Sequence, residues 1–229
     1  MTAVAAALAV EVILLDFDGP TCHLFAGRPA REIAADFRAY LARIGVPVDG
    51  ADPFDPLALY AAAVVADAGQ ADAAERWLTE AEVAAAGTAE PTPGCRAVLD
   101  AARAAGRPVV MVSNNSGGAV RAYLARERLT DHVADVVGRP HAAPDRMKPA
   151  PWPIQEAARR QKVSPASCVL IGDSVTDLDA ANAAGARSIG YANKPGKRER
   201  FTDATAIVDD MHAIADAIRA THADRTATP

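Results

Sequence analysis

The sequence predicts an α/β fold, a Rossmann-like parallel sheet sandwiched by helices, with an all-helical domain inserted near the N-terminus. Short runs of branched apolar residues alternate with helical patterns along most of the chain. Such alternation is typical of parallel strands whose crossover helices cover both faces of the sheet. The stretch after the first strand breaks it, because three helical segments occur there without a convincing strand. We expect a core domain of residues 1–23 and 93–229 and a helical domain of residues 24–92.

Six segments have the pattern of buried strands. Residues 10–15 (VEVILL) are mainly branched and apolar and end at a glycine-containing turn, as in a strand buried on both faces. We read the alanine-rich segment before this strand as a frayed lead-in. The other expected strands are residues 108–112, 134–137, 168–171, 187–189 and, more weakly, 206–208. Parallel strands would bring the residues that follow them to one edge of the sheet.

Helical patterns fill the intervals between these strands. The expected core helices are residues 95–105, 118–128, 153–161, 177–184 and 211–220, and the inserted helices are residues 30–44, 55–68 and 71–86. Glycine and proline punctuate the insert, and Pro91-Thr-Pro-Gly closes it. Ordinary helical packing without a separate role is the alternative for the insert. Residues 223–229 are small and polar, and we expect them to be disordered.

Composition excludes several classes of function. A chain of 229 residues that is 50% hydrophobic can bury a substantial core, so we expect a soluble globular protein. A net charge of -5 argues against nucleic acid or an anionic membrane as a partner. No apolar stretch reaches the roughly 20 residues of a membrane-spanning helix, and the N-terminus lacks the basic start of a signal peptide. Cys22, Cys95 and Cys168 match neither a disulfide framework nor a paired zinc motif, so we expect a cytoplasmic location.

A pair of acidic residues follows the first expected strand. Asp16 and Asp18 are two positions apart, so an extended chain would point both carboxylates to one side. Two such close negative charges stay ionised together only beside a cation, and otherwise one of them holds a proton. Either state is useful in catalysis. The alternative is a turn whose aspartates bond to their own backbone.

A second acidic pair lies in the segment GDSVTD. Asp173 ends a buried strand, and Asp177 begins the next helix. Helix capping alone could account for Asp177. Asp173 needs a dedicated partner, because it closes an apolar strand. A hard cation such as Mg²⁺ would serve several carboxylates at once.

Two further segments offer groups that suit phosphate. Ser113 ends the strand PVVMV, and Asn114 opens the polar loop after it, where hydroxyl, amide and backbone donors can meet phosphate oxygens. An N-cap serine is the alternative for Ser113. Lys148 is the single lysine before Lys162, which indicates a positioned charge, although a solvated surface lysine is the alternative. All four segments follow separate strands, so together they predict one site.

These motifs, in this order, resemble the haloacid dehalogenase superfamily. The matching elements are DFDG at residues 16–19, the strand-end Ser113, Lys148-Pro149, and GDSVTD at residues 172–177. Members with a helical cap domain after the first motif, such as phosphoglycolate phosphatase and β-phosphoglucomutase, are similar to this chain, and residues 24–92 would be the cap domain. The resemblance implies a Mg²⁺-dependent phosphatase acting on a small phosphorylated metabolite.

The resemblance also implies a role for each motif residue. Asp16 would attack phosphorus and form an aspartyl-phosphate, while Asp18 would act as the acid and base. Ser113, Asn114 and Lys148 would bind the phosphate. Mg²⁺ would be held by Asp16, Asp18 (through its backbone carbonyl), Asp173 and Asp177. The acid at Asp18 argues against the dehalogenases of the superfamily, because a leaving halide needs no proton.

Several alternatives stay open at this point. A sugar phosphomutase is the second candidate function, and a non-catalytic phosphate-binding protein is the third. The usual DGTL sequence is replaced here by DGPTCHLF, so the natural substrate cannot be read from the chain. The roles of Cys22, His23 and Lys194 and the oligomeric state are equally open.

Overall fold

A central parallel sheet organises the chain. In a computed structural model that describes residues 2–226, six strands pair in the order β5-β4-β1-β6-β7-β8, all of them parallel. The strands are β1 Val12–Leu15, β4 Val109–Val112, β5 Asp135–Val137, β6 Cys168–Gly172, β7 Arg187–Tyr191 and β8 Ala206–Val208. The first strand lies between β4 and β6, so the carboxyl ends of these three strands are neighbours. The predicted fold class is confirmed.

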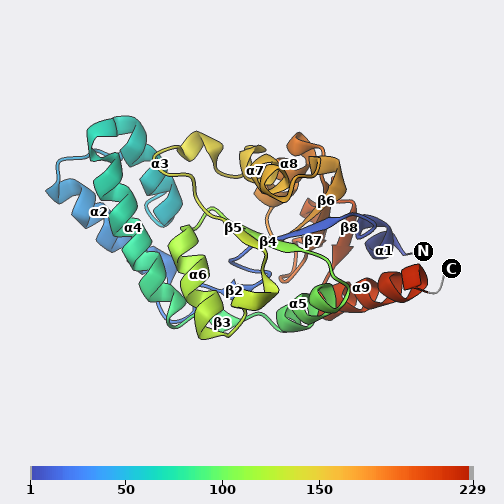
Figure 1. Ribbon diagram of the computed structural model, residues 1–229. Helices are drawn as coiled ribbons and strands as arrows, with labels where there is room; N and C mark the ends of the chain where they lie inside the picture. Colours follow the sequence, from blue (N-terminus) through green and yellow to red (C-terminus); the bar gives the residue numbers. More distant parts are fainter. Residues whose placement is uncertain (1, 227–229) are drawn as a thin grey trace.

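Alternating side chains of the strands build two cores. Ile13 and Leu15 of β1 face one side with α5 and α9, whereas Val12 and Leu14 face the other with α7 and α8. This alternation follows from the period of two in a strand. Figure 1 shows the two helix pairs on opposite faces of the sheet. The helices outside the insert are α1 Ala3–Ala7, α5 Cys95–Ala104, α6 Gly117–Arg126, α7 Trp152–Gln161, α8 Val175–Ala184 and α9 Met211–Thr226.

Three helices form a layer at one end of the molecule, away from the chain termini (Figure 1). They are α2 Ala30–Arg43, α3 Pro56–Ala66 and α4 Ala71–Ala86. Two short antiparallel strands, β2 Cys22–His23 and β3 Glu90–Pro91, pair where the chain leaves the sheet and returns to it. Stacked rings fix α2 on α4, with the centroids of Phe37 and Trp77 4.8 Å apart. The division into domains at residues 24–92 stays a prediction.

The described residues depart from the predicted elements at both ends. The expected frayed lead-in is wrong, because residues 3–7 form a short helix capped by the hydroxyl of Thr2, and Leu8 after it is buried. The first strand accordingly starts at Val12. The expected disorder from residue 223 is wrong as far as residue 226, where α9 ends, and residues 227–229 lie outside the described part.

Short 3-10 helices occupy several connections. They are η1 Ala68–Gln70, η2 Thr130–His132, η3 Pro144–Arg146, η4 Pro165–Ser167 and η5 Arg198–Arg200. The cysteines Cys22, Cys95 and Cys168 are free and buried. Within residues 2–226, none of the helices combines the length and apolar character that crossing a bilayer demands.

Candidate active site

The predicted residues meet at the carboxyl edge of the sheet. A pocket of about 340 Å³ opens there, and the side chains that line it include Asp16, Asp18, Ser113, Asn114, Lys148 and Asp173. Asp177 is fully buried beneath it. A larger hollow of about 620 Å³ at the opposite edge holds none of these residues. The structure therefore brings together every residue that the four motifs singled out.

Lys148 is buried at the floor of this site and joins two of the aspartates. Its Nζ donates to Asp16 Oδ1 at 2.6 Å, to Asp177 Oδ1 at 2.5 Å and to the Val112 carbonyl at 3.3 Å. Burial lowers the pKa of Lys148, but the two carboxylates outweigh it and raise that pKa above its usual value. The alternative of a solvated surface lysine is wrong.

Negative charge is in excess around Asp16. Burial, and then the charge of Asp177, raise the pKa of Asp16 well above its usual value, although Lys148 opposes them. The two carboxylates raise the pKa of Lys148, whereas the pKa of Asp16 rises mainly through burial, and one ammonium faces two buried carboxylates. The site is therefore ready to accept a further positive charge.

Asp177 both caps a helix and contacts Lys148. Its Oδ2 accepts hydrogen bonds from the Ser174 hydroxyl at 2.6 Å and the Ser174 N–H at 3.0 Å, completing a capping box at the start of α8. Its Oδ1 faces Lys148. The side chain folds so close to Gly172 that a Cβ there would lie 2.4 Å from the Asp177 Cβ. Glycine at the end of β6 thus makes room for the carboxylate.

Asp18 lines the pocket, and its side chain is partly buried. Its Oδ1 accepts from the Leu24 N–H at 2.9 Å, and burial raises its pKa above the usual value. The alternative of a turn bonded to its own aspartates holds for Asp18, which accepts from the nearby Leu24 N–H, but not for Asp16, which bonds to Lys148. At Gly19 the backbone has a φ of +115°, and an added Cβ would lie 2.4 Å from the Asp173 carboxyl carbon. Glycine lets this turn approach the second acidic motif.

Three aspartates could hold a metal ion. Asp16, Asp173 and Asp177 each offer a carboxylate oxygen, and these oxygens lie within 4.8 Å of one another. Within the described residues, the Asp18 carboxylate does not belong to this group. All three donors are oxygens and carry excess negative charge, so the set fits a hard divalent cation.

Asp173 has partners that the sequence left open. Lys197 Nζ donates to Asp173 Oδ2 at 2.5 Å and to its carbonyl at 2.6 Å, and Asn193 Nδ2 donates to Oδ2 at 3.0 Å. The basic loop after β7 thus reaches the second acidic motif. Lys194 lies close enough to Asp18 to lower its pKa slightly against the effect of burial.

The loop after β4 positions both Ser113 and Lys148. The Ser113 hydroxyl accepts from the Asn115 N–H at 3.0 Å, whereas the cap of α6 is Ser116. Asn114 Oδ1 accepts a hydrogen bond from the Lys148 N–H at 2.8 Å, and Asn114 Nδ2 donates to the Lys148 carbonyl at 2.9 Å. Asn114 therefore holds the backbone of Lys148 in place.

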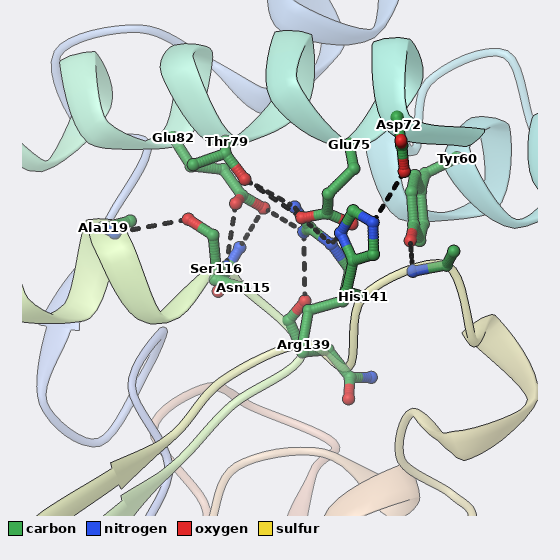
Figure 2. Close-up of polar contacts among 12 residues, drawn as sticks. Tyr60, Asp72, Glu75, Thr79, Glu82, Asn115, Ser116, Ala119, Arg139 and His141 are labelled. Carbon is green, nitrogen blue, oxygen red and sulfur yellow. Dashed lines mark hydrogen bonds and ion pairs between the residues drawn. The ribbon is translucent and has the colours of Figure 1, made fainter. Parts of the chain in front are cut away.

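Glu82 and Arg139 are part of this environment, and sequence reasoning missed them. Figure 2 shows Glu82 of α4 reaching the loop after β4, where it accepts from Asn115 Nδ2 at 3.1 Å and from the Ser116 N–H at 2.8 Å. Arg139 donates to Glu82 at 2.8 Å and grips both oxygens of Glu75. A signal existed in the sequence, because both glutamates fall on the apolar face of α4 that includes Leu78 and Ala85.

Comparisons with known proteins agree on the kind of molecule. A family model described as haloacid dehalogenase-like hydrolase matches residues 10–185. Phosphoglycolate phosphatase of Nitrosospira multiformis is 32% identical over 122 residues, which cover 52% of this chain and 53% of that protein. The chain thus spans about half the length of the curated relatives it matches.

Solved structures share the fold. CbbY from Rhodobacter sphaeroides, in complex with phosphate, superposes with a TM-score of 0.67 at 22% identity, covering 90% of this chain and 99% of that one. The β-phosphoglucomutase of Clostridium difficile gives a TM-score of 0.67 at 17% identity, with 95% and 99% covered. The family model covers well over half of the chain, and the four motifs lie together at the carboxyl edge of the sheet. This chain therefore belongs to the haloacid dehalogenase-like hydrolase family.

Proposed function

We propose that the protein is a Mg²⁺-dependent phosphatase that hydrolyses a small phosphate monoester through an aspartyl-phosphate on Asp16. The observation that carries this proposal is that Asp16, Asp18, Asp173 and Lys148 line one pocket, with Asp177 buried beneath it. Phosphoryl transfer asks mainly for positioning and charge neutralisation, and this set of groups supplies both.

Asp16 is the nucleophile in this proposal. Its carboxylate attacks phosphorus, the bond from phosphorus to the ester oxygen breaks, and the leaving oxygen takes a proton from Asp18. The raised pKa of Asp18 favours the protonated form that this step requires. Asp18 then accepts a proton from the water that attacks the aspartyl-phosphate, which releases inorganic phosphate and restores Asp16.

Lys148, Ser113 and Asn114 have different roles in binding the phosphate. Lys148 supplies a fixed positive charge, and Ser113 supplies a buried hydroxyl at the pocket wall. Asn114 acts through Lys148, whose backbone it holds. Asp16, Asp173, Asp177 and the backbone carbonyl of Asp18 would hold Mg²⁺, which would neutralise charge on the transferred phosphoryl group. Residues 24–92 would form a cap, since Phe25, Phe54 and Leu57 line the pocket.

The alternatives receive less support. Phosphate binding without catalysis needs no acid beside the nucleophile, yet Asp18 occupies that place. A phosphomutase must accommodate a sugar that carries a second phosphate, and Lys148 is the single cation in the described pocket lining. A cytoplasmic location and the exclusion of nucleic-acid and membrane partners stay predictions from composition.

Replacing the nucleophile tests the proposal. Asp16→Asn should lower Mg²⁺-dependent phosphate release from any ester at least about 10³-fold, because no aspartyl-phosphate can form. The measurement is inorganic phosphate release with p-nitrophenyl phosphate and alkyl phosphates, with circular dichroism to verify folding. Asp216→Asn, an exposed aspartate paired with Arg219 on α9, is the matched control and should keep full activity. Retained turnover in Asp16→Asn would disprove the assignment.

A further inference from the structure

The pocket has two unlike walls. Asp16, Asp18, Ser113, Lys148 and Asp173 are among the polar groups of the wall contributed by the sheet. The wall contributed by the helical insert is mainly apolar and consists of Phe25, Ala30, Phe54, Asp55, Pro56, Leu57 and Glu82. A phosphate bound over Asp16 would direct its leaving group toward this second wall.

The charges on the second wall are negative. Asp55 is exposed and caps α3 by accepting from the Leu57 N–H at 2.8 Å. Glu82 is buried, and its oxygens are occupied by Asn115, Ser116 and Arg139. Among the lining residues that the structure describes, Lys148 is the single cation, and it is committed to Asp16 and Asp177.

The buried arginine behind the pocket is also committed. Figure 2 shows Arg139 turned into α4, where its guanidinium contacts Glu75 and Glu82, and its side chain has no exposed surface. It also lies over the Tyr60 ring, with the guanidinium carbon 4.8 Å from the centroid. Its charge is therefore neutralised inside the protein and is not offered to a substrate.

Three basic groups lie near the site but outside the pocket lining. Lys197 is bound to Asp173. His23 and Lys194 lie near enough to Asp18 to lower its pKa slightly, but neither lines the pocket. A carboxylate or second phosphate on the leaving group would face the negative Asp55 without a counter-charge, and such a like-charge contact disfavours binding.

We infer that the pocket selects phosphate monoesters whose leaving group is uncharged and partly apolar, and that it discriminates against a second anionic group on the substrate. This inference rests on the proposed phosphatase function and names its substrate class. The apolar side chains Phe25, Phe54 and Leu57 contact the leaving group, and the negative Asp55 repels an anionic one. Phosphoglycolate, the substrate in the name of the Nitrosospira multiformis relative, is a poor substrate under this inference.

A matched pair of substrates tests the selection. 2-Phosphoglycolate and 2-hydroxyethyl phosphate have similar size, and they differ in a carboxylate against a hydroxymethyl group. With Mg²⁺ present, kcat/KM measured by phosphate release should be at least about 10-fold higher for 2-hydroxyethyl phosphate. Propyl phosphate should be hydrolysed at least as efficiently as 2-hydroxyethyl phosphate. Equal or higher kcat/KM for phosphoglycolate would overturn the inference.

A pair of variants tests whether the insert wall is responsible. Phe54→Lys places a cation at the pocket wall, and Phe54 is 69% exposed, so the change leaves the core intact. Val65→Lys is the matched control, because Val65 is 83% exposed, lies on α3 and does not line the pocket. Phe54→Lys should raise the ratio of kcat/KM for phosphoglycolate over 2-hydroxyethyl phosphate by about 5-fold or more, and Val65→Lys should leave it unchanged.

The outcomes separate this inference from the proposed function. If phosphoglycolate is the preferred substrate and Asp16→Asn abolishes its hydrolysis, the proposed phosphatase function is supported and the inferred substrate class is overturned. An unchanged ratio in Phe54→Lys would also overturn it. Absence of phosphate release from every ester would overturn both.

Discussion

Two buried basic side chains, Lys148 and Arg139, each contact two carboxylates. Lys148 lies between Asp16 and Asp177 at the pocket floor, with 4% of its side chain exposed. Arg139 lies between Glu75 and Glu82 under the helical insert, with 0% exposed. Formal charges are therefore alike at the two centres, which we call the lysine centre and the arginine centre. Their remaining hydrogen-bonding capacity differs.

The arginine centre is saturated. Arg139 donates to both oxygens of Glu75, to Glu82 and to the Asn114 carbonyl, and Ser116 and Asn115 serve the other contacts of Glu82. Burial would raise the pKa of Glu75, but hydrogen bonds and charge from Arg139 outweigh it and lower that pKa. A rigid guanidinium fork suits this purely structural task.

The lysine centre differs in having a third carboxylate beside it, although Lys197 is paired with that carboxylate. Asp173 brings a further carboxylate within 4.8 Å of Asp16 and Asp177, and the pKa of Asp16 rises because of burial and the charge of Asp177. A compact ammonium satisfies two of these groups and leaves room for another cation. Saturation thus distinguishes a centre that fixes structure from one that, under the proposed function, would bind a metal and a phosphate.

The largest effect on stability should come from breaking the arginine centre. Arg139→Met leaves Glu75 and Glu82 buried without a counter-charge, so we expect a loss of about 3–5 kcal/mol in the free energy of unfolding. Urea unfolding measures this loss, and Arg159→Met, an exposed arginine paired with Glu156, is a control expected to change it by less than about 1 kcal/mol.

A rescue keeps this prediction testable if the single variant does not fold. The triple variant Arg139→Met, Glu75→Gln, Glu82→Gln removes all three charges and should regain most of the lost stability. A single variant as stable as the parent protein would show that the arginine centre is not required.

The lysine centre should respond differently, because a metal can replace its cation. Lys148→Met should lower the thermal midpoint in EDTA, and saturating Mg²⁺ should restore part of it. Ligand linkage gives about 2.7 kcal/mol at a concentration 100 times the Kd. Arg139→Met should gain no more from Mg²⁺ than the parent does. Equal Mg²⁺ rescue of both variants would erase the proposed difference between the centres.

The smallest effect concerns the pH dependence of the unfolding free energy, to which the two centres should contribute slopes of opposite sign. The pKa of Glu75 is lowered on folding, so its contribution is present above its usual value of 4.5 and is lost as the pH falls through the folded pKa. The pKa of Asp16 is raised from 3.8, so the metal-free protein loses stability as the pH rises from 3.8 toward the folded pKa.

Variants separate these two contributions. In EDTA, Glu75→Gln should flatten the fall in unfolding free energy below pH 4.5, whereas Asp16→Asn should remove a loss that occurs above pH 3.8. Each proton accounts for at most about 1.4 kcal/mol per pH unit. Urea unfolding at pH 3–6 measures both slopes, and slopes of the same sign would contradict the contrast.

Much of the fold followed from the sequence because its physical causes are local. Runs such as CVLI are apolar on both faces, and the residue after each run necessarily reaches the same edge of a parallel sheet. That rule alone groups Asp16, Ser113 and Asp173 at one edge of the sheet, although their catalytic roles stay proposals.

What the sequence did not reveal depends on tertiary partners. Glu75 and Glu82 fall on the apolar face of α4, but the sequence does not show their partner Arg139, which lies far along the chain. The helix at residues 3–7 is too short to form alone and depends on packing of Ala7 and Leu8. The two-residue strands β2 and β3 have no pattern long enough to detect.

Gly172 has a consequence for how such a site can vary. A methyl group at that position would collide with the Cβ of Asp177, an atom that every residue except glycine possesses. Rotating the side chain of Asp177 cannot relieve this contact, so only a shift of the α8 backbone could. Positions 172 and 177 are thus sterically linked, and a larger residue at 172 would be compatible with this backbone only if glycine replaced the aspartate that contacts Lys148.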